Sequence, residues 1–194
     1  MIPVDSGNQD RAIQILTQAF HDDPVINWCS NHPEDVRPFF EITVPSYVSH
    51  GLTYIDPQGR GAASWLGPDQ TLTFSYAPGN MIKAIRMSGL RGVYRMIKAG
   101  MVTEREHPKQ PHYYLFAIGV TPASKGQGIG TALISNVLRR CDEEGMPAYL
   151  ENSKPDNLPF YEGHGFKVLK QIRPARSAPP LWLMWREPRT ADQP

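Results

Sequence analysis

YYLFAIGVTPASKGQGIGT, residues 113–131, is the segment from which the architecture of this chain can be worked out. Its apolar run, Tyr113–Val120, predicts a buried strand, and a short loop leads from there into a glycine-rich turn. A helical pattern starts directly after the turn, so the first N–H groups of that helix have no partner within it. These amides and the helix dipole attract anions, and glycine lets a phosphate reach the backbone. The segment therefore predicts a phosphate-binding site.

The helix after the turn is predicted to run from residue 129 to a stop at Gly145, because glycine accepts the left-handed conformation beyond a helix end. Its apolar residues recur every three or four positions on one face. They are Ile129, Leu133, Ile134, Val137, Leu138 and Cys141. A second apolar run, residues 148–150, then closes with Glu151. The unit is strand, crossover helix and strand, which predicts a right-handed connection between parallel strands.

Three phosphate-binding motifs compete for this unit. A nucleotide P-loop carries its lysine after the glycines, whereas Lys125 precedes them here. A dinucleotide-binding fingerprint has an acidic residue about 20 residues further on, where Glu151 stands. However, its third glycine position is occupied by Thr131, and a five-residue loop separates the strand from Gly126. This second motif keeps open a dinucleotide-dependent oxidoreductase.

The third motif fits better. The pattern Val120-x-Pro122-x-x-Lys125-x-x-Gly128-x-Gly130 resembles the acyl-coenzyme A motif of the GNAT N-acetyltransferases. About 30 residues downstream, the stretch NLPFYEGHGF (157–166) resembles the Asn, Tyr and Gly-Phe signature of the same family. Within the family, the last 80 or so residues are most similar to the puromycin N-acetyltransferase branch. The sequence departs from the family at Lys125, where Arg or Gln is usual.

The resemblance implies an α/β fold with a mixed, mostly antiparallel twisted sheet, helices on both faces, and one parallel strand pair that splays apart. It implies a single domain over residues 1–194, with residues 1–110 on the acceptor side, residues 111–186 binding acetyl-CoA, and residues 187–194 forming a frayed tail. The implied reaction is transfer of acetyl from acetyl-CoA to a primary amine of a small molecule, such as an antibiotic. The implied mechanism is direct transfer in a ternary complex.

The resemblance also assigns roles to individual residues. The cofactor is expected to contact two residues of the splayed strand, the glycine-rich turn, and two residues downstream. These are Ile118, Val120, Lys125, Gly126, Gln127, Gly128, Ile129, Gly130, Thr131, Ser153 and Asn157. Backbone N–H groups near Val120 are expected to polarise the acetyl carbonyl. Tyr161 matches the family's general acid, because a phenol stays protonated at neutral pH and can protonate a departing thiolate.

The general base is less defined by the sequence. Glu151, at the end of its strand, is the first candidate, with Glu41, Asp22 and Asp23 as alternatives. A cysteine acyl-enzyme is a further option, for which Cys29 and Cys141 are the candidates. A non-catalytic acyl-CoA-binding regulatory module also remains open. The scattered histidines offer no zinc motif, so no metal is expected.

The composition argues against some classes of partner and against a fold held by disulfides. The net charge of +1 gives no reason to expect a nucleic-acid or membrane partner, and two cysteines do not make a disulfide framework. We expect a cytoplasmic monomer or homodimer. A basic segment of residues 80–109 carries seven Lys or Arg against two Asp or Glu, which predicts a solvated helix to about Gly100 followed by a polar linker.

The rest of the chain predicts alternating short elements. Helices are expected from residue 8 or so to Phe20, at 25–28, at 38–49 with a kink or break at Pro45, and at Leu158–Gly163. Strands are expected at 2–4, 165–172 and Leu181–Arg186, and as a hairpin of 51–56 with 62–66. Residues 71–77 fit either a strand or a loop.

Overall fold

The computed structural model describes residues 1–32, 35–49, 51–70 and 78–189. Within these ranges the strands form one sheet in the order β1-β2-β3-β4-β5-β7-β6. They are β1 (Ile2–Pro3), β2 (Thr53–Ile55), β3 (Gly61–Leu66), β4 (Tyr113–Val120), β5 (Ala148–Asn152), β6 (Lys167–Ile172) and β7 (Leu181–Arg186). The pairing of β4 with β5 is parallel, and the other pairings are antiparallel. The mixed sheet expected from the sequence is thus confirmed, and a doubly wound dinucleotide-binding sheet is excluded for this part of the chain.

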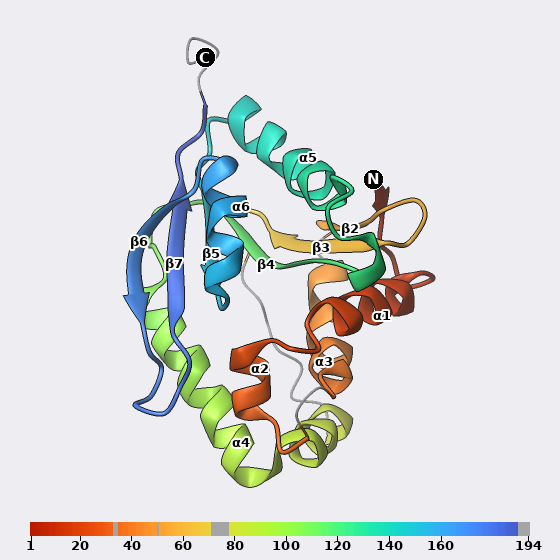
Figure 1. Ribbon diagram of the computed structural model, residues 1–194, viewed down its shortest axis with the longest axis vertical. Helices are drawn as coiled ribbons and strands as arrows, with labels where there is room; N and C mark the ends of the chain where they lie inside the picture. The colour runs from red at the N-terminus through yellow and green to blue at the C-terminus, as the bar shows by residue number, and fades with distance from the viewer. Residues whose placement is uncertain (33–34, 50, 71–77, 190–194) are drawn as a thin grey trace.

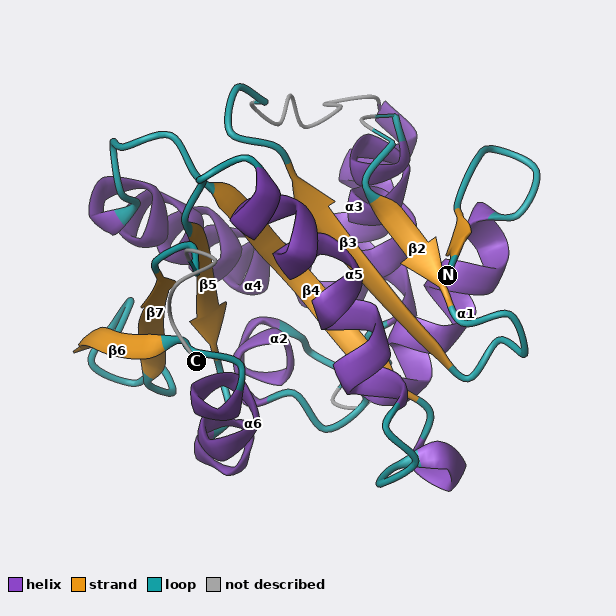
Figure 2. Ribbon diagram, turned by 90° about the horizontal axis from the view of Figure 1, so that it is seen from above, coloured by secondary structure: helices purple, strands orange, loops and turns teal. Residues whose placement is uncertain are grey.

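Helices cover both faces of the sheet (Figures 1 and 2). They are α1 (Gln9–Ala19), α2 (Pro24–Cys29), α3 (Arg37–Val48), α4 (Pro78–Glu106), α5 (Ile129–Glu143) and α6 (Leu158–Gly163), with short 3₁₀ turns η1 (Pro122–Ser124) and η2 (Pro155–Asn157). Helices α5 and α6 share one hydrophobic core with β3, β4, β5 and β7. Helices α1 and α3 pack on the opposite face of the sheet, and α2 and α4 contribute to a third cluster beside β5 and β7. We call the side of the sheet that α5 and α6 cover the α5 face, and the opposite side the α3 face.

Helix α5 forms where its periodicity predicts. The six apolar residues named above are all buried, and Leu133 and Ile134 are 0% exposed. Burying a side chain of this size contributes about 1.5–3 kcal/mol, so this face fixes the helix against the sheet. The helix ends just before Gly145, which has φ +64° as a left-handed glycine beyond a helix end should.

The N-terminal half departs from expectation at two points. Helix α3 continues through Pro45 without a break, because Phe40, Val44 and Tyr47 are buried around it and this packing outweighs the missing backbone hydrogen bond. Helix α4 extends to Glu106, beyond the expected end, and is interrupted at Gly89 by a non-helical conformation with φ +60°. Residues 71–77, expected as strand or loop, lie outside the described residues.

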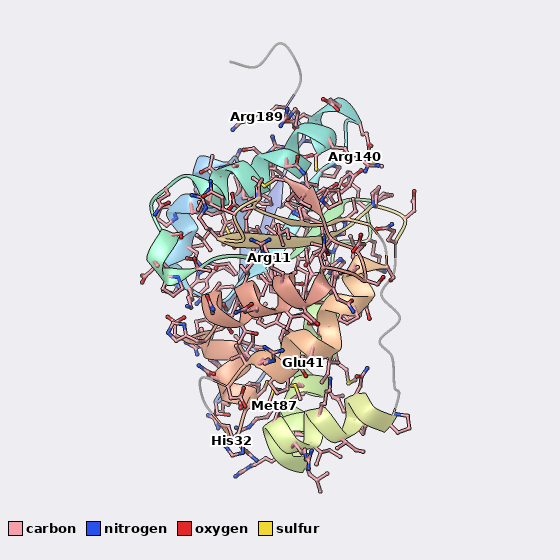
Figure 3. All side chains as sticks on the ribbon, turned by 90° about the vertical axis from the view of Figure 1, so that its right-hand side faces the viewer. Arg11, His32, Glu41, Met87, Arg140 and Arg189 are labelled. Carbon is pink, nitrogen blue, oxygen red and sulfur yellow. The ribbon has the colours of Figure 1, made fainter. Side chains whose placement is uncertain are left out.

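Figure 3 shows the two ends of the molecule. Arg140 and Arg189 lie at the end beside α5, whereas Met87 and His32 lie at the opposite end beside α4. Helix α4 exposes apolar side chains at several positions, among them Leu90, Ile97 and Met101. In the described ranges, no helix combines the length and the apolar character that crossing a bilayer requires.

Candidate active site

The central feature is the place where β4 and β5 separate. Their parallel pairing covers only three positions, from Tyr113 opposite Ala148 to Leu115 opposite Leu150. Beyond Leu115, β4 continues for five residues along β3 without β5 beside it. A bulge in the β3–β4 pairing, at Phe116, coincides with the point of separation. We call the space between the diverging ends of β4 and β5 the splay.

The open edge of β4 presents backbone groups to the splay. Thr121 N–H donates to the Arg60 carbonyl across the pairing with β3, at 2.8 Å. In an antiparallel ladder the direction of these groups alternates, so those of Gly119 also face β3. The N–H and C=O groups of Ile118 and Val120 consequently face away from β3, toward the splay. Both residues therefore offer free main-chain partners there, at the positions that the sequence suggested.

The glycine-rich turn follows directly and is open to solvent. Gly126 and Gly128 have φ values of +79° and +73°, a conformation that strongly favours glycine, and both are exposed. A Cβ atom placed on either would meet no atom within 4 Å, so these glycines are not required for packing. Gly128 is the N-cap of α5 and gives no side-chain cap, which leaves the first amides of α5, at Ile129, Gly130 and Thr131, outside the helical ladder.

Two cationic side chains lie near this turn. Lys125 is exposed and extended immediately before Gly126. Arg60, in the turn between β2 and β3, has its Nη1 atom 3.5 Å from Oε1 of Gln127, and its guanidinium is fixed by Asp56 at 2.9 Å. Sequence reasoning missed Arg60, because it stands 67 positions before Gln127 in the chain.

Tyr161, on α6, reaches the splay from the α5 face. Its side chain is buried at 8% exposure among Phe160, Phe166 and the α5 core. Burial, together with the nearby Asp23 carboxylate, raises the pKa of the Tyr161 hydroxyl above its ordinary value. That hydroxyl makes no hydrogen bond to another described residue. A protonated phenol without an internal partner is suited to donate its proton to a ligand.

Ser153 and Asn157 have different surroundings. The Ser153 hydroxyl donates to Asp23, which ties the turn after β5 to the start of α2. The other oxygen of Asp23 accepts from the N–H groups of Val25 and Ile26. Asn157 is exposed at the start of α6. The structure thus gives Ser153 a role in holding the loop and leaves the Asn157 side chain on the surface.

Glu151 is the first residue of β5 beyond its pairing with β4, and its side chain lies on the α3 face. Oε2 accepts a hydrogen bond from the Tyr114 hydroxyl at 2.6 Å. The negative charge of Glu151 and burial raise the pKa values of the Tyr47, Tyr114 and Tyr149 hydroxyls, with burial as the larger cause in each case. The carboxylate therefore sits among aromatic rings that stay neutral, beside the splay and opposite Tyr161.

The alternative bases are engaged elsewhere. Glu41 pairs with Arg37 at 2.8 Å and with Lys83 at 3.0 Å, and these hydrogen bonds lower its pKa. Asp22 pairs with Lys154 at 2.5 Å, which lowers its pKa as well. Asp23 is occupied by the contacts described above. Among the candidates from the sequence, Glu151 is the one that belongs to a strand of the splay.

The cysteine option is not supported by the described structure. Burial raises the pKa values of the Cys29 and Cys141 thiols to about 12, so both are protonated at neutral pH. Neither cysteine is disulfide-bonded. Across the described ranges, no group of three or more His, Cys, Asp or Glu side chains could hold a metal ion.

Two functional candidates were not found from the sequence. His107, directly after α4, and His112, directly before β4, lie next to Glu151. The sequence placed His107 in a polar linker of residues 104–111, with His112 directly after it, because the expected helix ended near Gly100. Only the length of α4 and the register of β4 against β5 bring them together with Glu151.

Part of the sequence matches a known protein family. The acetyltransferase (GNAT) family model matches residues 94–166. An uncharacterized N-acetyltransferase of Schizosaccharomyces pombe is 29% identical over 217 residues, which covers 98% of this chain and 84% of the relative.

Solved structures share the fold. A structure from Corynebacterium glutamicum, described as 'histone acetyltransferase HPA2 and related acetyltransferase', has a TM-score of 0.72 at 23% identity. The match covers 99% of this chain and 97% of that one. Drosophila melanogaster polyamine N-acetyltransferase, which forms N-acetylagmatine, has a TM-score of 0.63 at 16% identity, covering 96% and 98%. Aedes aegypti arylalkylamine N-acetyltransferase 2 has a TM-score of 0.65 at 14% identity, covering 96% of this chain and 97% of that one.

Proposed function

We propose that this chain is an acetyl-CoA-dependent acetyltransferase of the GNAT superfamily and that it acetylates a primary amine of a small molecule by direct transfer in a ternary complex. The observation that carries the proposal is the splay of β4 from β5 directly before the uncapped start of α5. It supplies, side by side, backbone groups for an acylated arm and amides for a diphosphate.

The cofactor binds from the α5 face in this proposal. The amides of Gln127, Gly128, Ile129 and Gly130 hold the diphosphate, the Thr131 hydroxyl adds a donor, and Lys125 and Arg60 add positive charge. The pantetheine arm runs along the open edge of β4 and bonds to the backbone of Ile118 and Val120. Gly126 keeps the approach to the turn open. Asn157, exposed at the start of α6, also contacts the arm in this proposal.

The amine binds from the α3 face. Neutral aromatic rings around the Glu151 carboxylate suit an arriving ammonium group, because ring faces and a carboxylate both stabilise a cation. Glu151 then accepts the proton of the amine, and the neutral nitrogen attacks the acetyl carbonyl held at β4. The thiolate that leaves takes a proton from Tyr161 on the opposite face. Base and acid thus stand on the two sides of one strand gap.

The acceptor class has support from two sources. Two proteins of the same fold are described as acting on agmatine or arylalkylamines, which are small amines. The similarity of the C-terminal part to the puromycin N-acetyltransferase branch puts amino-group-bearing antibiotics in the same class. The buried reduced cysteines suit a protein that works in the cytoplasm.

The test is a screen of primary amines with acetyl-CoA, in which release of free thiol is measured. Small polyamines, arylalkylamines and amino-nucleoside antibiotics form the panel. We expect at least one amine to give steady turnover with intersecting initial-rate patterns. Parallel patterns would instead indicate an acyl-enzyme, and no turnover with any amine, despite tight acetyl-CoA binding by calorimetry, would contradict the proposal.

A further inference from the structure

Three titratable side chains form a chain of contacts next to the splay. Nδ1 of His107 lies 3.7 Å from Oε1 of Glu151, and Nε2 of His107 lies 3.0 Å from Nε2 of His112. Nδ1 of His112 lies 2.6 Å from the Gln110 carbonyl oxygen. The other oxygen of Glu151, Oε2, is held by the Tyr114 hydroxyl, so that Oε1 is the oxygen turned toward His107.

These contacts fix where the ring protons lie. A carbonyl oxygen only accepts, so the proton of neutral His112 is on Nδ1, toward Gln110. Burial lowers the pKa of His112, which keeps that ring neutral at pH 7, with a lone pair on Nε2. His107 must therefore donate its Nε2–H to His112. It follows that neutral His107 presents the lone pair of Nδ1 to the Glu151 carboxyl group.

We propose that His107 is the relay that removes the amine's proton from Glu151, with His112 as the positioning residue that holds His107 in the receiving tautomer. The proposal rests on the acetyl-transfer function given above. The ammonium N–H bond breaks as an O–H bond forms on Glu151. That O–H bond breaks in turn as an N–H bond forms on Nδ1 of His107, and Glu151 is again an anion.

His107 is placed to pass the proton on. Its side chain is 26% exposed, against 11% for Glu151, so the imidazolium can release its Nδ1 proton to water. The rings of Tyr114 and Tyr149 stand nearly perpendicular to the imidazole, with centroids 5.0 and 4.8 Å away. They hold the ring while leaving one side to solvent.

The other titratable groups around this pair do not exchange protons near neutral pH. Burial and the Glu151 charge raise the pKa values of Tyr47 on α3, Tyr114 on β4 and Tyr149 on β5. On α4, Glu106 pairs with Lys170 of β6 at 2.6 Å, which lowers the pKa of Glu106. The proposed proton transfer therefore involves only Glu151 and His107 of this group.

The kinetic test compares His107→Gln with Glu151→Gln and with the double variant, using whichever amine the wild type acetylates. We expect His107→Gln to lower kcat by about 10- to 100-fold, which is below the full effect of a general base because water can take the proton slowly. We expect the KM for acetyl-CoA to change by less than about two-fold. In the double variant we expect no further loss, because His107 acts through Glu151.

Two additional measurements separate a relay from a structural role. Imidazole added to His107→Ala is expected to restore turnover, while pyrazole, a similar ring that is a much weaker base, is not. His32→Gln, a change of an exposed histidine beside α4, serves as the control and is expected to match the wild type. Thermal unfolding of every variant shows whether a loss of activity reflects a loss of folding.

A spectroscopic measurement tests the ring protons without turnover. The ¹⁵N shifts of the wild-type imidazoles are expected to show neutral His107 as the Nε2–H tautomer and His112 as the Nδ1–H tautomer. Nδ1–H on neutral His107 would overturn the proposal. So would a fall in kcat below ten-fold for His107→Gln, or a loss that multiplies with that of Glu151→Gln. A wild type that acetylates no amine would refute the proposed function instead, and the tautomers could still be read.

Discussion

The chain offers main-chain amides on one side of the splay and buried side chains on the other. The turn of residues 125–131 is mostly exposed, lacks a side-chain cap and includes two glycines, Gly126 and Gly128, with open space around them. The Glu151 cluster draws its groups from α3, β4, β5 and the segment after α4, and it is largely buried. In the proposed function, the first arrangement recognises the part of a ligand that never changes, the diphosphate. The second recognises and deprotonates the part that is chemically transformed.

Replacing Glu151, the proposed general base, is expected to have the largest effect on kcat. Glu151→Gln keeps an oxygen to accept from Tyr114 but cannot take a proton, so we expect kcat to fall by about 10²- to 10⁴-fold. The dissociation constant of acetyl-CoA, measured by calorimetry, should stay within about three-fold. A Glu151→Gln variant that keeps the wild-type kcat but binds acetyl-CoA much more weakly would contradict this assignment.

A matched control lies on the opposite face of the sheet. Tyr113 donates to Oε2 of Glu144 at 2.6 Å, the same contact that Tyr114 makes with Glu151. Glu144→Gln therefore removes an equivalent carboxylate away from the splay. We expect its kcat to match that of the wild type, which would attribute the loss in Glu151→Gln to position and not to the Tyr–carboxylate contact.

Tyr161→Phe tests the acid side and is expected to lower kcat by about 100-fold without changing the affinity for acetyl-CoA. The pH profile gives a second measure. Burial and Asp23 raise the pKa of Tyr161, so the proton that it donates remains bound at higher pH than in an ordinary tyrosine. Hence wild-type kcat should show no descending limb from this group below about pH 10. A descending limb near pH 8 that Tyr161→Phe abolishes would contradict this assignment.

The two sides also differ in how far the sequence could predict them. The glycine turn is local: Gly126, Gly128 and Gly130 announce it by spacing, and the periodicity of α5 confirms the helix that follows. Tyr161 was assigned through the family resemblance of residues 157–166, which is also a local stretch of sequence. Contacts within such a unit follow from neighbouring residues, so a single sequence contains them.

The base side could be predicted only in part. Glu151 was identified at a strand end, but His107 gained its place from the two extra turns of α4 and from the pairing of Tyr114 with Tyr149. Register between strands depends on long-range packing and not on residue spacing. Pro45 shows the same limit, because the buried residues around it decided that α3 would continue.

Replacing a glycine of the turn is expected to have an intermediate effect, on the affinity for acetyl-CoA. Gly128→Ala places a side chain at φ +73°, which costs roughly 1–2 kcal/mol, and strains the first amides of α5. If that strain acts on the bound geometry, the affinity for acetyl-CoA weakens by about 5- to 30-fold in a calorimetric titration.

Gly145→Ala is the control for this substitution. Gly145 has φ +64°, also with no atom within 4 Å of an added Cβ, but it follows the far end of the same helix. Both variants should lower the melting temperature to a similar extent, and only Gly128→Ala should weaken cofactor binding. Equal weakening by both would mean that the turn has no special part in holding the diphosphate.

The smallest expected effect belongs to Lys125. If main-chain amides hold the diphosphate, an exposed lysine adds a screened point charge, and Lys125→Ala should weaken acetyl-CoA binding only about two- to five-fold. The weakening should shrink further as salt is raised from about 0.05 to 0.5 M, because salt screens exposed charges. Lys125→Arg should bind like the wild type, and Lys98→Ala, a charge removed from the exposed side of α4, should leave binding unchanged. A loss of 100-fold or more for Lys125→Ala would show that a side chain, and not the backbone, dominates this side of the splay, and the contrast between the two sides would disappear.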